Sequence, residues 1–173
     1  MGMVFYGTGE AQCSFFSTGE GSSEYHVTAG APRGKDVPEE LARLWESYTE
    51  LLSNQGLDDD TLVFTRFYLS DPSNQRDFLM RSRVFAHARN GAVSIIRQSP
   101  AQGGSVAMFA YHVRGREGAL SKERVALGGP GGGNGVFVRG AGYELAWLAG
   151  VAGTGILDSC AQTTGVFGEY AGF

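Results

Sequence analysis

The chain of 173 residues lacks the marks of secreted, membrane and nucleic-acid-binding proteins. Its two cysteines, Cys13 and Cys160, lie far apart and form no CxxC motif, so no disulfide framework is expected and a cytoplasmic location is predicted. No run of about 18 apolar residues predicts a membrane span, and no basic start with an apolar core predicts a secretory signal. The net charge of −4 offers no cluster of Lys and Arg for phosphates, so no nucleic-acid partner is expected.

Motifs for common catalytic chemistry are also missing. The three histidines, His26, His87 and His112, show no metal-ligand spacing and lack nearby cysteine or carboxylate partners in the sequence, so we interpret them as ordinary strand or helix residues. No GxSxG motif surrounds a nucleophile, and the glycine run around Pro130 lacks the Lys-Ser/Thr pair of a phosphate loop. Neither a metal nor a cofactor is predicted.

A hydrophobic content of 42% with 18% charged residues is typical of a folded globular domain. Its clearest element is a helix that starts at Asp36, which can accept hydrogen bonds as the N-cap, with Glu39 in a capping-box position. Gly56 is a natural stop for this helix. One apolar face recurs at helical spacing: Leu41, Leu44, Trp45, Tyr48, Leu51 and Leu52.

The other elements predict an α+β domain. Asp71 starts a second helix, whose predicted buried side consists of Phe78, Leu79 and Phe85. Segments rich in β-branched and aromatic residues predict strands within 3–16 and over 25–30, 62–69, 92–98 and 105–113. The order β-β-α-β-α-β-β predicts a mixed β-sheet with two helices packed on one face.

The composition changes after Arg116, because over half of the 27 glycines follow it. This change predicts a domain over 1–115, a glycine-rich linker over 116–136 and a further unit over 137–173. The further unit is interpreted as a partial repeat of the first, with a strand over 143–150 and a helix from about residue 158. In that alignment 26–30 matches 146–150, and the helix face of the first unit matches Val166, Phe167, Tyr170 and Phe173.

The passage 41–113 resembles the RidA/YjgF family, also described as endoribonuclease L-PSP-like. The resemblance is carried by the helix with its Gln55-Gly56-Leu57 exit and by the strand that ends in Leu69-Ser70-Asp71. It implies a chorismate-mutase-like fold, a homotrimer and small-molecule sites in clefts between subunits. Active members act as 2-iminobutanoate/2-iminopropanoate deaminases, so the resemblance also raises a hydrolase activity.

Three positions depart from the pattern that the family implies. An arginine that holds the substrate carboxylate is expected before the penultimate strand, and its place falls on Gly91, with Arg89 two residues earlier. The acid expected in the final strand becomes Ala107, and the expected helix asparagine becomes Leu79. Shifting the alignment with the family by one or two residues would make Arg89 the anchor, but no such shift places an acid in the final strand.

Four residues are candidates for ligand binding: Arg97, Arg89, Arg66 and Gly30. Arg97 is read either as a sheet-edge residue in an ion pair across an interface or as a displaced carboxylate-binding arginine. The first functional hypothesis is a RidA-like domain without standard imine deaminase activity that binds a small carboxylated or aromatic metabolite at a subunit interface. The alternatives are an active deaminase with a rearranged arginine anchor and a structural assembly module of a longer tandem protein.

Overall fold

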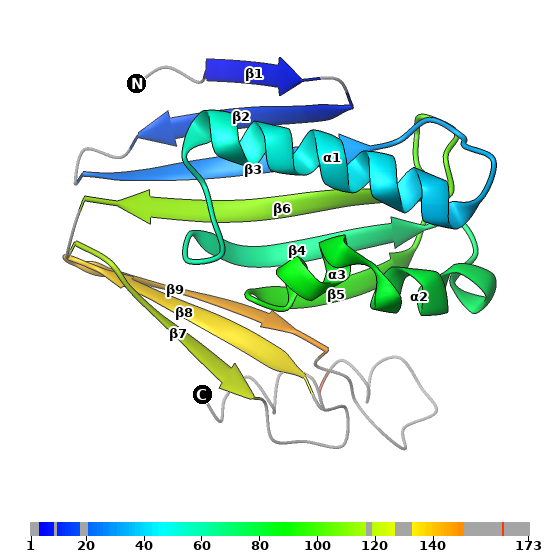
Figure 1. The fold of residues 1–173 in the computed structure, drawn as a ribbon. Coiled ribbons are helices and arrows are strands. Elements are labelled where there is room, and N and C mark those ends of the chain that lie inside the picture. Colours follow the sequence, from blue (N-terminus) through cyan, green and yellow to red (C-terminus); the bar gives the residue numbers. More distant parts are fainter. Residues whose placement is uncertain are drawn as a thin grey trace.

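The computed structural model describes residues 4–8, 10–17, 21–116, 119–126, 133–150 and 164. Its elements in chain order are β1 Val4–Thr8, β2 Ala11–Ser17, β3 Ser22–Gly30, α1 Val37–Gln55, β4 Leu62–Leu69, α2 Pro72–Arg81, α3 Arg83–Ala88, β5 Ala92–Arg97, β6 Val106–Gly115, β7 Ser121–Ala126, β8 Asn134–Gly140 and β9 Tyr143–Ala149. The helices lie on one face of a six-stranded mixed sheet, and a three-stranded sheet lies on its other side (Figure 1). This architecture confirms the predicted α+β class.

The six strands follow the order β1-β2-β3-β6-β4-β5. The pairs are antiparallel except β4 with β5, which run parallel and are joined through α2 and α3. The predicted opening strand within 3–16 is a hairpin of β1 and β2. No helix among the described residues is long and apolar enough to cross a membrane.

Helix α1 starts and ends as its sequence predicts. The Asp36 side chain accepts a hydrogen bond from the backbone N–H of Glu39 at 2.9 Å, and Gly56 ends the helix with a left-handed backbone, φ 62°. The face that carries Leu44 and Tyr48 is fully buried against the sheet. It forms the main core together with strand residues of β2, β3, β4 and β6.

The predicted second helix is broken at Ser82, and one of its predicted core residues is wrong. Ser82 has an extended backbone, ψ 158°, and its hydroxyl accepts from the N–H of Phe85, so a separate helix starts there. Leu79 is fully buried, as predicted, and Phe85 packs against the core. Phe78 is 48% exposed. Consecutive helical residues point about 100° apart, so Leu79 and Phe78 cannot both face the sheet.

A second core lies between the six-stranded sheet and the three-stranded sheet β7-β8-β9. Val136 and Val138 of β8 are buried there against strand residues of β4 and β6. The Trp147 ring of β9 packs on Phe64 and Tyr111, with ring centroids 5.2 and 4.7 Å apart. The segment predicted as linker, 116–136, therefore contains β7 and the start of β8. The predicted helix near residue 158 lies outside the described residues, and the partial repeat stays a prediction.

Candidate functional site

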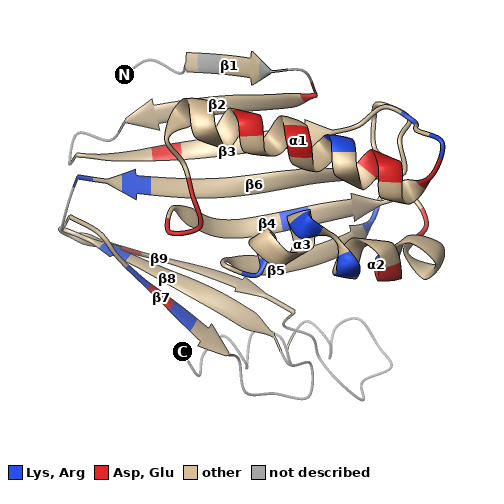
Figure 2. Ribbon diagram, in the orientation of Figure 1, with Lys and Arg blue, Asp and Glu red and all other residues tan. Residues whose placement is uncertain are grey.

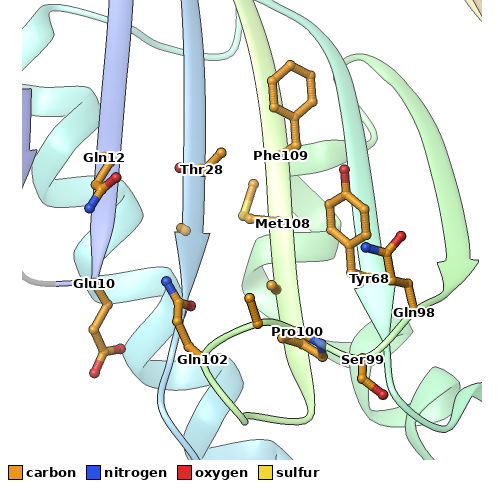
Figure 3. Close-up of a pocket in the computed structure, with 13 residues that line it drawn as sticks. Glu10, Gln12, Thr28, Tyr68, Gln98, Ser99, Pro100, Gln102, Met108 and Phe109 are labelled. Atoms are coloured by element: carbon orange, nitrogen blue, oxygen red, sulfur yellow. The ribbon is translucent and has the colours of Figure 1, made fainter. Parts of the chain in front are cut away.

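The candidate site is a pocket of about 280 Å³ on the face of the sheet that is opposite to the helices, called here the open face. Side chains from four adjacent strands and the loop 98–102 surround it (Figure 3). Its lining residues are Glu10, Gln12, Thr28, Ala29, Tyr68, Gln98, Ser99, Pro100, Ala101, Gln102, Ala107, Met108 and Phe109.

Strand register brings the wall of this pocket together. Gln12 of β2 pairs with Thr28 of β3, and Thr28 pairs with Phe109 of β6. Ala107 of β6 pairs with Tyr68 of β4. Directly paired residues of antiparallel strands point to the same face, so these five side chains share the open face.

The loop 98–102 is fixed at both ends. Its start is held by the N–H of Gln98, which donates to the Leu69 carbonyl at 2.9 Å. Beyond its end, the buried Glu40 carboxylate accepts from the N–H of Ser105 at 2.6 Å and from that of Gly34 at 3.0 Å. Bonds to a charged acceptor are stronger than neutral ones, so α1 holds this loop in place beside the pocket.

The pocket contains carboxamides and hydroxyls but no cation among its lining residues. Its one carboxylate, Glu10, forms an ion pair with Arg43 through Oε1. Oε2 of Glu10 is buried and has no hydrogen-bond partner among the described residues. The oxygen has essentially no accessible surface, so a ligand in the pocket would not contact it in this conformation.

Of the four candidate residues named from the sequence, one lies beside the pocket. Gly30 ends β3 next to Gln102 and Ala107, and a Cβ there would come within 2.3 Å of the Gln102 amide oxygen. Arg66 is exposed, two residues from Tyr68 on β4, with its guanidinium over the Phe64 ring at 5.3 Å. Both lie at the open face or its edge.

The other two candidates are exposed elsewhere. Arg97 is the last residue of β5, an edge strand, and Arg89 follows α3 as its C-cap. At Gly91, the place that the family resemblance gives to the anchor arginine, a Cβ would lie 2.8 Å from the Val63 carbonyl oxygen. The backbone would have to move for any side chain to fit at that position.

A buried hydrogen-bond network contains two of the three histidines, and one of them, His87, has a carboxylate partner that lies far away in the sequence. His112 lies between the hydroxyls of Tyr48 and Thr61, at 2.9 and 3.0 Å. Tyr48 also contacts His87 at 3.2 Å, and His87 pairs with Asp59 at 2.6 Å. Asp59 lies far from both histidines in the sequence, so spacing could not reveal the contact.

Burial sets the protonation of this network. It lowers the pKa of His112 from 6.5 to about 3, with His87 and Lys122 as smaller causes, and burial also lowers the pKa of His87 against the pull of Asp59. Burial likewise raises the pKa of the Tyr48 hydroxyl. None of these residues lines the open-face pocket, and no group of His, Cys, Asp and Glu within the described ranges could hold a metal. The network therefore joins α1, α3 and β6 structurally.

The sequence did not single out the three glutamines of the pocket, Gln12, Gln98 and Gln102. Gln12 alternates with the buried residues Ala11 and Cys13, which predicts a position on the opposite face of a strand. The other two lie in a loop, where no periodicity indicates direction. The three glutamines meet at the pocket only because β3, β4 and β6 pair beside it.

No protein-family model and no curated protein matches the sequence. Solved structures do match over most of their own length. A YjgF-family protein from Neisseria meningitidis has 16% identity over 67% of this chain and 98% of its own, with a TM-score of 0.48. Yeast Mmf1 has 13% identity over 62% and 86%, with a TM-score of 0.45. A YjgF/YER057c/UK114-family protein from Mycobacterium tuberculosis has 20% identity over 60% and 83%, with a TM-score of 0.40.

The described part of the chain over 4–116 is an α+β domain with its helices on one face of a six-stranded mixed sheet. Its element order is the one that the sequence patterns predict, with two differences: the opening strand is a hairpin, and the second helix is broken. At 13–20% identity and TM-scores of 0.40–0.48, the likeness to these solved structures says nothing of ligand or activity.

Proposed function

We propose that this chain is a RidA-like domain that binds a small aromatic metabolite in the open-face pocket and does not hydrolyse imines by the family's usual route. The observation that carries the proposal is the lining of the pocket: aromatic and carboxamide side chains, with no cation and no unpaired carboxylate group. A partner subunit packed on the open face of a homotrimer would complete the site.

The case against imine hydrolysis rests on proton transfer. A general acid or base must lie within hydrogen-bond reach of the reacting group. The family resemblance expects an acid at Ala107, whose methyl group lines the pocket. The remaining carboxylate, Glu10, is paired with Arg43 at the edge of the pocket.

The case for an aromatic ligand rests on complementarity. Tyr68 and Phe109 offer ring surfaces on the same face, on which a flat ligand can stack. Gln98 and Gln102 each carry an amide that donates and accepts. Such a set fits a neutral group with both N–H and C=O better than a carboxylate.

The activity is tested by the release of ammonia from 2-iminopropanoate generated in situ. We expect the rate with wild-type protein to equal the buffer background, with an active imine deaminase as the positive control. A wild-type rate above background would reject the proposal that the chain does not hydrolyse imines. Arg97→Ala, Arg89→Ala and Glu10→Gln would then name the anchor and the acid.

The ligand class is tested with two molecules of the same shape, benzamide and benzoate, followed by NMR shifts of the glutamine side-chain amides. We expect benzamide to shift the signals of Gln98 and Gln102 saturably and benzoate to shift them weakly. Gln98→Ala should weaken the response, whereas the exposed Asn54→Ala should not. Tighter binding of benzoate that Arg66→Gln abolishes would instead assign Arg66 as a carboxylate anchor, and no response to either molecule would reject the pocket.

A further inference from the structure

A second cavity, unrelated to the open-face pocket, lies in the helical layer between α1 and the break that separates α2 from α3. Its volume is about 530 Å³. Leu41 and Trp45 line it from α1, and Phe78 lines it from α2. Arg81, Ser82 and Arg83 line it at the break. We call this cavity the helix groove; it lies within the size range of pockets that hold small organic ligands, about 300–1,000 Å³.

The walls of the helix groove are apolar and well supported. Leu41 is buried, and the half-buried Trp45 ring packs against His87 with ring centroids 5.6 Å apart. Phe78 is 48% exposed because it points away from the core-facing side of α2, where its neighbour Leu79 is fully buried. An exposed Phe beside a supported Trp gives two ring surfaces that a flat apolar body can cover.

Two arginines supply the charge. Arg81 and Arg83 are exposed, and neither has an ion-pair partner within the described residues. Figure 2 shows mainly acidic positions along α1, and basic positions on α3 and, beside one acidic position, on α2. The one carboxylate among the lining residues is Glu46 on α1, so cations outnumber anions in the groove. A guanidinium matches a carboxylate or sulfonate in a bidentate geometry.

We propose that the helix groove binds a small organic anion with an apolar body, of the aryl-carboxylate class. The body lies between the Trp45 and Phe78 rings, and the carboxylate pairs with Arg81 and Arg83. A cation of the same shape would be repelled by the two guanidinium groups. A neutral analogue would keep the apolar contacts and lose the ion pairs.

The test uses protein labelled with 5-fluorotryptophan, in which Trp45 and Trp147 give one fluorine NMR signal each. The probes are 2-naphthoate and its neutral counterpart 2-naphthamide. We expect 2-naphthoate to shift the Trp45 signal saturably and to bind about tenfold tighter than 2-naphthamide. Arg81→Gln with Arg83→Gln should remove this preference and leave 2-naphthamide unchanged, while the exposed Arg33→Gln should change neither.

Three results would overturn the proposal. The first is a Trp45 signal that 2-naphthoate does not move, or a response confined to Trp147. The second is equal affinity for both probes in the wild-type protein. The third is a Trp45 signal that shifts on dilution of the protein alone, which would mean that a second copy of the chain occupies the groove. None of these readouts depends on the open-face pocket.

Discussion

Two buried threonines differ in whether the hydroxyl has a partner. Thr65 of β4 is fully buried, and its Oγ1 has no hydrogen-bond partner among the described residues. Thr61 accepts from the N–H of Asp58 at 2.9 Å and contacts His112 at 3.0 Å. We expect Thr65→Val to stabilise the fold by about 1 kcal/mol, because valine keeps the shape and removes an unpaired polar group.

The matched variant is Thr61→Val, which should cost about 1–3 kcal/mol because it leaves its buried partners unsatisfied. Urea denaturation of both variants beside the wild type measures the free energy of unfolding. A loss of stability in Thr65→Val would mean that its hydroxyl has a partner that the structure does not describe. The opposite signs separate this effect from a general cost of changing a buried threonine.

Single residues of the site were predictable only where strand alternation or the family resemblance gave a direction. The resemblance drew attention to Ala107, which does line the pocket. Three of the four candidates were arginines, but no arginine or lysine lines the pocket. The residue type alone does not predict where in the fold a charged side chain lies. Arg97 ends an edge strand, and Arg89 caps a helix. Their roles stay a prediction.

At the scale of elements, local signals predicted boundaries and missed contacts between elements. Asp36 and Gly56 bound α1 through hydrogen bonds that lie within the helix ends, so the sequence contains the whole signal. The break at Ser82 has a weaker signal, since serine is tolerated inside helices as well as at caps. The network around His112 has none, because it joins α1, α3 and β6 across long stretches of chain.

That network makes stability depend on pH. His112 stays neutral in the folded protein, because its pKa is lowered to about 3, whereas the unfolded chain takes up a proton near 6.5. The folded state therefore loses stability as the pH falls from about 6.5 towards 3. We expect a loss of about 2 kcal/mol between pH 7 and pH 5 from this group, measured by urea denaturation at each pH.

The control separates His112 from the other titrating groups. His112→Gln keeps a polar side chain between Tyr48 and Thr61 and removes the titration, so the slope between pH 7 and pH 5 should flatten. An unchanged slope in His112→Gln would assign the pH dependence to other groups, of which His87 is the first to test.

At the scale of the molecule, the segment 116–136 is predicted as a glycine-rich linker, yet its described part contains β7 and the start of β8. Together with β9 these strands form a sheet that packs on the open face beside β4 and β5. Asn134 of β8 accepts from the N–H of Val93 on the edge strand β5 at 3.0 Å. Strands β7, β8 and β9 pair antiparallel in chain order, as β1, β2 and β3 do. This similarity supports the proposal that the unit is a partial repeat. The glycine content of a segment is an average over its residues, so it does not exclude a short strand within the segment.

The part of the open face that β7–β9 leaves uncovered predicts self-association. Phe16, His26 and Phe109 form a half-buried aromatic row there, with ring centroids about 6 Å apart. Apolar rows of this kind mark interaction surfaces, and the family resemblance supplies the number of three subunits. We expect the wild-type chain to sediment with three times its mass of 18.4 kDa. Phe16→Asp should then give monomers, because a carboxylate would be buried without a partner.

The same substitution on the other side of the molecule is the control. Phe78 is exposed on the helical layer, so Phe78→Asp should leave the trimer intact if the open face is the interface. Circular dichroism of both variants checks that each remains folded. A monomeric wild type would reject the trimer, and dissociation by Phe78→Asp alone would move the interface to the helix groove. In that case the open-face pocket would have to bind its ligand within one subunit.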